Sequence, residues 1–197
     1  MSTSAPIDAP RTKAFAPADL AYIAVFAALL SALSQLTVAL GPVPFTLQTL
    51  GVALAALILG PWRGAAAVLL YIVVGAAGLP VFAGGKAGLS VLLGATGGYL
   101  VSFVIGSIVI GYVAQWALRK GLSPVTPVWF FLGCLLSRYL VVLPIGVGWL
   151  ANYLDKPFVE TMIATDMPFW LWDAAKSLFA VLIAVAVHKA FPRLLGR

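Results

Sequence analysis

The sequence predicts an all-α integral membrane protein with six transmembrane helices. Of its 197 residues, 62% are hydrophobic and only 9% are charged, and the mean hydropathy is +1.07. A soluble globular domain is about 45–50% apolar and about 25% charged. The third observation is the arrangement of the apolar residues, which form six runs separated by short breaks. Since a membrane span needs about 20 residues, the length of the chain suits six spans in one membrane domain.

The six runs follow one another along most of the chain. Residues 1–19 are polar and rich in Pro and Ala, and we expect them to be a disordered cytoplasmic segment ahead of the membrane domain, residues 20–197. The first run lacks a clear cleavage site, which favours a span over a signal peptide. A polar loop precedes the last run. The runs cover about residues 20–40, 47–59, 65–79, 91–118, 128–150 and 169–191.

The second and third runs are shorter than a full crossing, and Gly and Pro mark the breaks beside them. The chain reads GPVPFT after the first run and PVFAGGKAGLS after the third. Irregular backbone at membrane depth is tolerated only inside protein or beside a cavity. Two interpretations remain: a cavity bounded by these two loops, or ordinary turns between helices.

The distribution of Lys and Arg predicts the orientation. With the N-terminus inside, only Lys86 and Lys156 fall in outside loops, whereas eight cations fall on the cytoplasmic side. Such a bias is typical of cytoplasmic loops, so both termini are predicted to be cytoplasmic in a multi-pass protein of the cell membrane. The eight cations are Arg11, Lys13, Arg63, Arg119, Lys120, Lys189, Arg193 and Arg197.

A charged pair lies inside the sixth run. Asp173 and Lys176 are three residues apart, which places them on one face of a helix. A charge within a span costs at least about 2.5–3.5 kcal/mol, so such residues are usually functional. In the predicted topology they lie in the outer half of the span, which indicates a polar ligand site open to the outside. The alternative is an ion pair that satisfies only itself.

Three neighbouring candidates are less well determined. Trp170 and Trp172 flank the pair and serve either as interfacial anchors or, for one of them, as a stacking surface for a ligand. Arg138 is the other cation at membrane depth, near the middle of the fifth run. It pairs with a carbonyl group or with Asp173, reaches the interface with its long side chain, or faces another subunit.

The first run carries small residues at every fourth position, and such a stripe lets helices approach closely in lipid. It packs either within the domain or against another membrane protein. Cys134, the single cysteine, stands in an apolar run and is expected to be a small buried hydrophobe. The stripe consists of Ala24, Ala28 and Ala32.

Motifs for catalysis, metal binding and nucleotide binding do not occur in the sequence. His188 is the single histidine, and there is no HExxH, Cys/His cluster, GxSxG or GxxxxGK[ST]. The net charge of +6 is spread over short loops and termini, which argues against nucleic acid as a partner. We therefore expect a protein that is not an enzyme and holds no metal or cofactor, and any active transport must draw on an ion gradient or another subunit.

Several stretches resemble the BioY family, the biotin-binding S components of energy-coupling factor (ECF) transporters. The stretch 42–85, PVPFTLQTLGVALAALILGPWRGAAAVLLYIVVGAAGLPVFAGG, is long and specific, and LLGATGGYL at 92–100 follows it. DAAK at 173–176 is similar to the Asp-x-x-Lys that the family carries at the start of its sixth helix. The alanine stripe is similar to the one with which S components dock on the T component. The resemblance covers nearly the whole chain after residue 20.

The resemblance implies an S-component fold that binds biotin from outside with high affinity. Uptake would use a T component and two ATPase subunits, with the S component toppling in the membrane. Asp173 would accept from the ureido N–H groups or help to place Lys176, and Lys176 would meet the carboxylate or a ureido oxygen. Thr46 and Gln48 would face the pocket or cap the second helix. The implied site residues are Asp173, Lys176, Phe82, Thr46, Gln48, Lys86, Tyr99 and Trp170.

One departure from the family concerns the loop after Phe82. It reads VFAGGKAGL and lacks the asparagine that family members can carry there to bond the ureido group, so that Lys86 or backbone amides would replace it. The alternative function is a stand-alone secondary transporter for a small carboxylate or another vitamin. Such a protein usually needs a coupling site near the midplane, where only Arg138 lies. The sequence leaves the oligomeric state, including a homo-oligomer, open.

Overall fold

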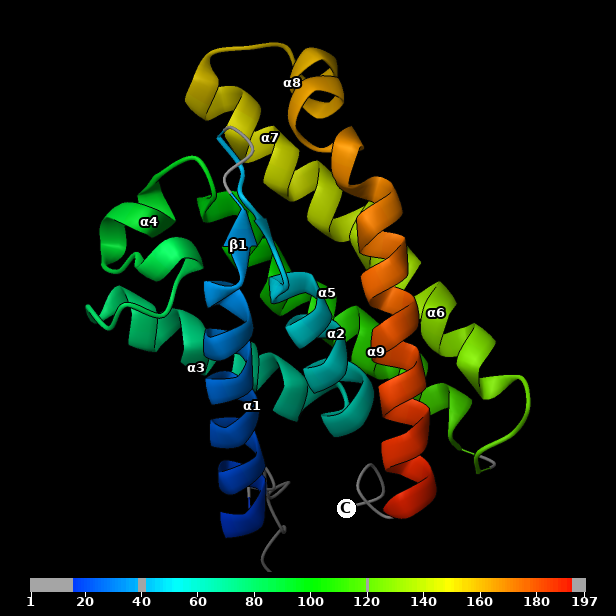
Figure 1. Ribbon diagram of the computed structural model, residues 1–197. Coiled ribbons are helices and arrows are strands. Elements are labelled where there is room, and N and C mark those ends of the chain that lie inside the picture. Colours follow the sequence, from blue (N-terminus) through cyan, green and yellow to red (C-terminus); the bar gives the residue numbers. More distant parts are fainter. Residues whose placement is uncertain (1–15, 39–41, 120, 193–197) are drawn as a thin grey trace, which may run out of the picture.

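The computed structural model describes residues 16–38, 42–119 and 121–192, and its ribbon is a bundle of helices (Figure 1). Most of the predicted N-terminal segment and several of the cytoplasmic cations, Arg11, Lys13, Lys120, Arg193 and Arg197, lie outside the described residues. The helices are α1 (Pro17–Gln35), α2 (Gln48–Leu59), α3 (Pro61–Ala76), α4 (Leu89–Leu93), α5 (Gly97–Ala117), α6 (Thr126–Ser137), α7 (Leu143–Leu154), α8 (Phe158–Thr165) and α9 (Trp170–Ala190).

Short elements connect or interrupt these helices. The strands β1 (Thr37–Val38) and β2 (Phe45–Thr46) pair antiparallel, with Thr37 opposite Thr46. The 3₁₀ turns η1 (Ala83–Gly85) and η3 (Met167–Phe169) follow α3 and precede α9. The π-helical stretch η2 (Arg138–Val142) joins α6 to α7, so that one helical segment runs through residues 126–154.

Four helical segments are long and apolar enough to cross a membrane. The shorter apolar helices α2 and α3 lie between the first and the second of them. These elements correspond to the six apolar runs, so the described part of the chain is a helical protein with several membrane-spanning segments. The four segments are Pro17–Gln35, Gly97–Ala117, Thr126–Leu154 and Phe158–Ala190.

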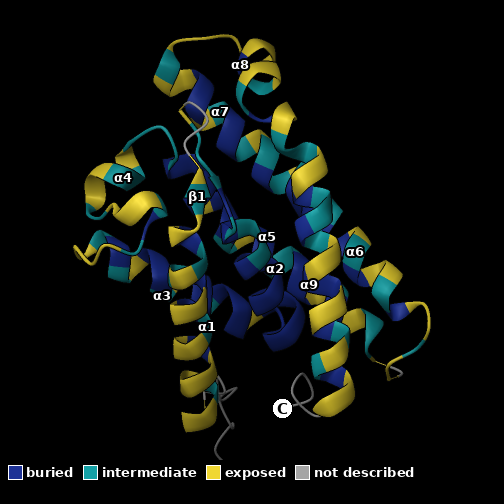
Figure 2. Cartoon of the chain, in the orientation of Figure 1, coloured by how far each residue is buried: buried dark blue, intermediate teal, exposed yellow. Residues whose placement is uncertain are grey.

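The short helix α2 forms the centre of the bundle. Its residues are apolar almost all round, a composition typical of a fully buried helix. All but Thr49 and Leu50 are buried, and α2 packs against α1, α3, α5 and α9 (Figure 2). The outer helices α1 and α9 instead expose large apolar side chains, such as Val25 and Phe179, as expected for surfaces in contact with lipid.

A tight turn joins α2 to α3 inside the bundle. Gly60 ends α2 with a positive φ of 82°, and Pro61 begins α3 at the first helical position, where its missing N–H costs no hydrogen bond. Gly111 of α5 lies directly against this turn, since a Cβ there would be 2.3 Å from the nitrogen of Pro61. The close contact sets the position of α5 relative to α2 and α3.

The last turn of α1 contacts the loop after α3. Ser34 Oγ donates to the carbonyl of Val81, and Gln35 Nε2 donates to the carbonyl of Phe82 at 3.3 Å. Segments 43–46 and 82–86, from the loops after α1 and α3, line one cavity. The interpretation of these breaks as cavity walls is therefore confirmed over that of ordinary turns.

Two boundaries differ from the prediction. The first helix ends at Gln35 and not near residue 40, because the chain turns there into β1, which pairs with β2. The polar loop expected before the last helix contains α8, which Pro157 precedes and whose Glu160 in the first turn complements the helix dipole. Thr161 Oγ1 also donates to the carbonyl of Pro157 at 3.0 Å.

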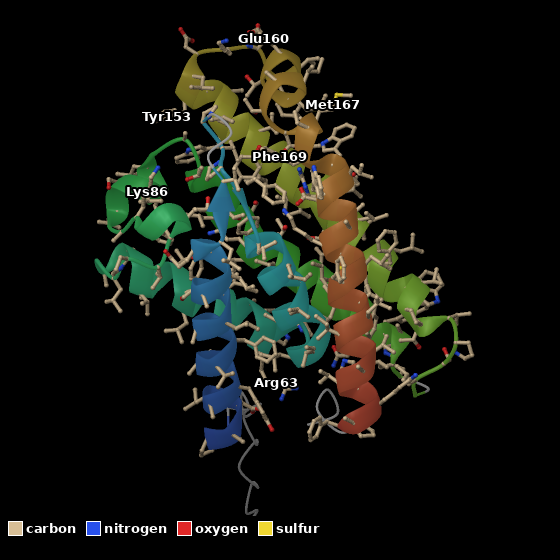
Figure 3. The ribbon with its side chains drawn as sticks, viewed as in Figure 1. Arg63, Lys86, Tyr153, Glu160, Met167 and Phe169 are labelled. Carbon is tan, nitrogen blue, oxygen red and sulfur yellow. The ribbon has the colours of Figure 1, made fainter. Side chains whose placement is uncertain are left out.

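The two ends of the described chain lie at the same end of the bundle, where α1 begins and α9 finishes (Figure 1). Arg63 lies toward this end, whereas Lys86 and Glu160 lie toward the other (Figure 3). Arg63 Nη1 forms an ion pair with Asp19 Oδ1 at 2.9 Å, which ties the start of α1 to the α2–α3 turn.

Candidate functional site

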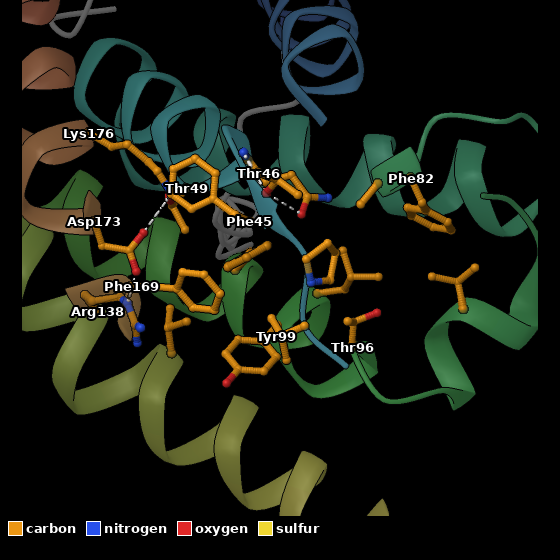
Figure 4. Close-up of a pocket in the computed structure, with 18 of the residues that line it drawn as sticks. Phe45, Thr46, Thr49, Phe82, Thr96, Tyr99, Arg138, Phe169, Asp173 and Lys176 are labelled. Atoms are coloured by element: carbon orange, nitrogen blue, oxygen red, sulfur yellow. Dashed lines mark hydrogen bonds and ion pairs between the residues drawn. The ribbon is translucent and has the colours of Figure 1, made fainter. Parts of the chain in front are cut away.

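The predicted charged pair lies on the inner face of α9. Asp173 and Lys176 are 6% and 8% exposed, and Lys176 Nζ donates to Asp173 Oδ1 at 3.1 Å. The prediction that both groups share one face of a helix is confirmed, and that face is buried. Figure 4 shows the two side chains at one side of a pocket. They do not form an isolated ion pair, because further side chains bond the same carboxylate.

Arg138 is the second cation at this carboxylate. Its Nε donates to Asp173 Oδ2 at 2.7 Å, which decides among the partners left open for it. Thr49 of α2 donates its hydroxyl to Asp173 Oδ1 at 3.1 Å. Asp173 thus accepts from three side chains, while an ionised carboxylate has about four acceptor positions. The π-helical stretch that carries Arg138 is a feature found frequently at functional sites.

The other branch of the Arg138 guanidinium reaches Asp166. Nη2 donates to Asp166 Oδ2 at 2.8 Å, and this carboxylate, 2% exposed, also accepts from Tyr99 Oη at 3.0 Å and Trp170 Nε1 at 2.9 Å. Asp166 was not among the site residues predicted from the sequence. Its place four residues before Trp170, and seven before Asp173, is the local signal that could have identified it.

Four charges therefore form one buried network: Lys176, Asp173, Arg138 and Asp166. Two are cations and two are carboxylates, so their formal charges cancel. Removing an ion from water costs several kcal/mol, and the network offsets this cost by pairing each charge and adding hydrogen bonds. Such pairing is what allows charged residues to occupy membrane depth.

A cavity of about 90 Å³ adjoins the network. Lys176, Asp173, Arg138 and Thr49 form its polar wall (Figure 4). The other walls are largely apolar and come from residues 43–46, the start of α2, the loop after α3, helices α4 and α5, and the ends of η2 and η3. They consist of Val43, Pro44, Phe45, Thr46, Gln48, Phe82, Ala83, Lys86, Val91, Thr96, Tyr99, Leu100, Phe103, Val142 and Phe169.

Phe45 of β2 covers the charged end of the cavity. Its ring centroid lies 4.1 Å from Lys176 Nζ, a cation–π contact. The ring also lies 6.0 Å from those of Phe169 and Trp172, measured between centroids. Phe45 was not predicted as a site residue, because only the folded hairpin brings β2 to α9; Phe169, at the end of η3 directly before α9, was not predicted either.

Thr46 and Gln48 line the cavity and also shape the start of α2. The backbone N–H of Gln48 donates to Thr46 Oγ1 at 3.2 Å, and Thr46 Oγ1 donates to Gln48 Oε1 at 3.1 Å. Gln48 Nε2 then donates to Tyr71 Oη at 2.6 Å. Of the two alternatives, facing the pocket therefore holds for both residues, whereas capping does not, because the N-cap residue of α2 is Leu47 and no side chain caps the helix there.

Phe82 closes the cavity on the side opposite α9 (Figure 4). It is 1% exposed and packs edge-on against Tyr71 with centroids 5.5 Å apart. A Cβ at Gly75 would lie 2.3 Å from the Phe82 ring, so the ring needs a glycine there. Phe82 N donates to the carbonyl of Lys86 at 3.0 Å, which places exposed Lys86 beside it at the mouth.

The remaining predicted aromatic residues differ in placement. Tyr99 lines the cavity with its ring, while its hydroxyl bonds Asp166. Trp170 lies outside the lining; it donates to Asp166 and packs against Tyr139 with centroids 5.5 Å apart. Its contact is with the network and not with the cavity. Trp172 is 58% exposed, which agrees with the anchoring alternative.

The alanine stripe lies on the exposed face of α1. Ala24, Ala28 and Ala32 are all exposed, so the alternative of packing within the domain is wrong for them. Cys134 is 3% exposed among apolar side chains, as predicted. In residues 16–38, 42–119 and 121–192, no group of three or more His, Cys, Asp or Glu side chains is arranged to hold a metal ion.

Comparison with known proteins gives a consistent result. The model of the BioY family matches residues 8–193. The biotin transporter BioY of Rhizobium etli is 37% identical over 183 residues, covering 91% of this chain and 97% of that protein. The probable biotin transporter BioY of Pyrococcus horikoshii is 37% identical over 166 residues, covering 84% and 93%.

A solved structure is similar over almost the whole chain. It is the crystal structure, at 2.1 Å, of the S-component for biotin from an ECF-type ABC transporter. The TM-score is 0.81 at 26% sequence identity, and the match covers 89% of this chain and 95% of that one.

Proposed function

The chain belongs to the BioY family, and on this premise we propose that it binds biotin in the cavity beside Asp173 and mediates its uptake. It is a transport protein and not an enzyme, and it is a multi-pass protein of the plasma membrane. Residues 20–197 act as one substrate-binding membrane domain in this proposal.

The observation that carries the proposal is the contrast between one charged wall of the cavity and its largely apolar other walls. One wall carries the charged groups of Lys176, Asp173 and Arg138, and the others are largely aromatic and aliphatic. Biotin has the matching composition, with an apolar bicyclic body, a ureido group that both donates and accepts, and a carboxylate. A few polar groups within an apolar concavity are typical of small-molecule sites. We propose that seven residues of this lining contact biotin, because their side chains border the cavity. They are Asp173, Lys176, Phe82, Thr46, Gln48, Lys86 and Tyr99.

The size of the cavity implies movement during binding. Its 90 Å³ is below the range of about 300–1,000 Å³ typical of small-molecule sites. Segments 43–46 and 82–86 form the walls with the least helical support. We propose that these two segments move apart to admit biotin and close over it.

We also propose six membrane crossings with both termini in the cytoplasm. The crossings are α1, α2, α3, α5, the α6–α7 segment and α9. The positions of Arg63 at one end of the bundle, and of Lys86 and Glu160 at the other, agree with this topology (Figure 3). The cavity loops then lie toward the outside, where the transported molecule arrives.

Energy for transport would come from other subunits. The sequence contains no GxxxxGK[ST] motif, so the phosphate-binding loop of an ATPase is not on this chain. The proposed partners are a T component and two ATPase subunits, with the exposed face of α1 as the docking surface. The alternative, a stand-alone secondary transporter for a small carboxylate, would not need that surface.

Calorimetric titration of the purified protein with biotin tests the central proposal. We expect saturable binding of one biotin per chain at submicromolar concentrations, because a largely enclosed pocket with several hydrogen-bonding groups supports high affinity. A small monocarboxylate without a ureido ring, such as pentanoate, serves as the control. No binding at micromolar biotin, or equal binding of pentanoate, would contradict the proposal.

A further inference from the structure

A second, smaller cavity lies beneath the charged network. Its volume is about 30 Å³, and it shares Thr49, Arg138 and Asp173 with the cavity described above, which we call the substrate cavity. The residues that line only the smaller cavity lie one or two turns deeper on α2, α5, α6 and α9, away from the loops at the mouth. They are Val52, Ala53, Ile110, Cys134, Ser137 and Ser177.

The hydroxyl group of Ser137 lacks a protein partner in this region. Ser137 is 2% exposed and lines the smaller cavity, and its Oγ forms no hydrogen bond within residues 16–38, 42–119 and 121–192. The side chain points toward α5, because a Cβ at Gly106 would lie 2.6 Å from this oxygen. A buried hydroxyl without a hydrogen bond is unfavourable, so this group calls for a small polar ligand.

Two neighbouring residues add further polar groups. Arg138 uses Nε and Nη2 on carboxylates, while its Nη1 is buried without a hydrogen-bond partner among the described residues. Ser177 Oγ donates to the carbonyl of Asp173 at 2.8 Å and keeps its lone pairs as acceptors. The lining thus combines one unpaired donor with two hydroxyl groups, and a ligand that both donates and accepts would satisfy all three.

The size and the charge of the smaller cavity select water as this ligand. A cavity needs about 10–15 Å³ and several polar partners to hold one water molecule, so this one has room for about two. An anion would add an uncompensated charge to a network whose four charges cancel. A metal cation would lie beside Arg138, and the carboxylate of Asp173 already accepts from three side chains.

We propose that ordered water occupies the smaller cavity, bonded to the hydroxyl groups of Ser137 and Ser177 and to the guanidinium of Arg138. The water then holds Arg138 from the side away from the mouth of the substrate cavity. Ser137 does not line the substrate cavity, so it is a positioning residue that acts on the ligand only through water and Arg138. This effect on the ligand rests on the proposed function, whereas the water site does not.

A crystal structure of the unaltered, purified protein near 2 Å resolution tests the water site. We expect density for at least one water molecule within about 3.2 Å of Ser137 Oγ, with further contacts to Ser177 or Arg138. A second crystal soaked in bromide should give no anomalous peak in this cavity. A cavity without density, or one that takes up bromide, overturns the proposal. Because no substitution is involved, this test does not depend on the folding of a variant.

Calorimetric titration with biotin tests the positioning role of Ser137. Ser137→Ala is expected to weaken biotin about fivefold, as for the loss of one ordinary hydrogen bond, and the crystal structure of this variant should show a shifted Arg138 guanidinium. Ser107→Ala is the matched control, because the buried Ser107 hydroxyl donates to the carbonyl of Val104 at 2.7 Å and lines neither cavity. Its affinity should stay within about twofold of that of the unaltered protein.

The outcomes separate the positioning role from the proposed function. Equal biotin affinities for the Ser137→Ala variant and the unaltered protein overturn the positioning role. If the unaltered protein does not bind biotin, the proposed function fails, and the crystal structure still decides on the water site.

Discussion

At the scale of single residues, Arg138 links two carboxylates that are 28 and 35 positions away in the sequence. Each of these carboxylates collects two further donors, from α2, α5 or α9. Asp166 thus contributes to the site without lining the cavity, since it holds Arg138 and, through it, Asp173. We regard Asp166 as a positioning residue.

Asp166→Asn tests this role. The amide keeps the size but removes the charge and turns one acceptor oxygen into a donor that faces other donors. Breaking a buried ion pair in this way costs about 3–5 kcal/mol, so we expect a clearly lower melting temperature in detergent and weaker biotin binding.

Glu160→Gln is the matched control, because its pair with Lys156 is exposed and such pairs contribute about 0–1 kcal/mol. Equal melting temperatures and biotin affinities for the Asp166→Asn and Glu160→Gln variants would show that Asp166 has no positioning role.

Local spacing explains which residues of the site were predictable. Asp173 and Lys176 lie on one helical face whatever surrounds the helix, and their contact is confirmed. The partner of Arg138 depended on how the α6–α7 segment is rotated toward α9, which no local pattern specifies. Thr49 is 124 residues from Asp173, so local spacing could not predict their hydrogen bond.

At the scale of elements, α1 presents two different faces. Ile23, Ala27 and Leu30 pack inward, whereas the alanine stripe defined above is exposed on the opposite face, in the middle of the helix. Small residues on an exposed face permit close approach of another helix. This arrangement supports docking of a partner subunit on α1.

Ala28→Trp tests docking. The indole would project from the exposed face and prevent close approach, so we expect loss of co-purification with the T component and ATPase subunits while biotin affinity is unchanged. Leu132→Trp adds similar bulk to α6, where the native side chain is 46% exposed, and should retain the partners. If the Ala28→Trp variant still co-purifies with these subunits, the docking surface is not the alanine stripe of α1.

At the scale of the whole molecule, the start of α1 and the end of α9 lie toward one end of the bundle, and the cavity loops lie toward the other (Figures 1 and 3). The distribution of cations along the sequence predicts that the chain ends face the cytoplasm. With that orientation the cavity would face outward, as the proposed capture of external biotin requires.

Labelling of intact cells with a membrane-impermeant maleimide tests this orientation. Glu160→Cys should react, whereas Lys189→Cys, also exposed, should react only after permeabilisation. The native Cys134 is buried, so the unaltered protein provides the background. If the Lys189→Cys variant reacts in intact cells, the end of α9 lies outside the cell and the proposed topology is wrong.

The sequence by itself determined the membrane class, the six apolar segments and the shared face of Asp173 and Lys176. These features depend on composition and on the helical repeat, which act locally. It also determined the family, because motifs such as DAAK keep their spacing along the chain. The helix in the expected polar loop was missed because neighbouring Asp and Pro residues obscured its short apolar pattern.

The tertiary structure alone decided that the four charges neutralise one another and which residues surround the cavity. Those contacts depend on the rotation and depth of each helix, which are set by close packing such as Gly111 on Pro61 and Phe82 over Gly75. A shift of one helix by a few ångströms would leave the same sequence pattern but separate Arg138 from both carboxylates. The physical reason is that ion pairs act over a short range, whereas the patterns in the sequence report only one helix at a time.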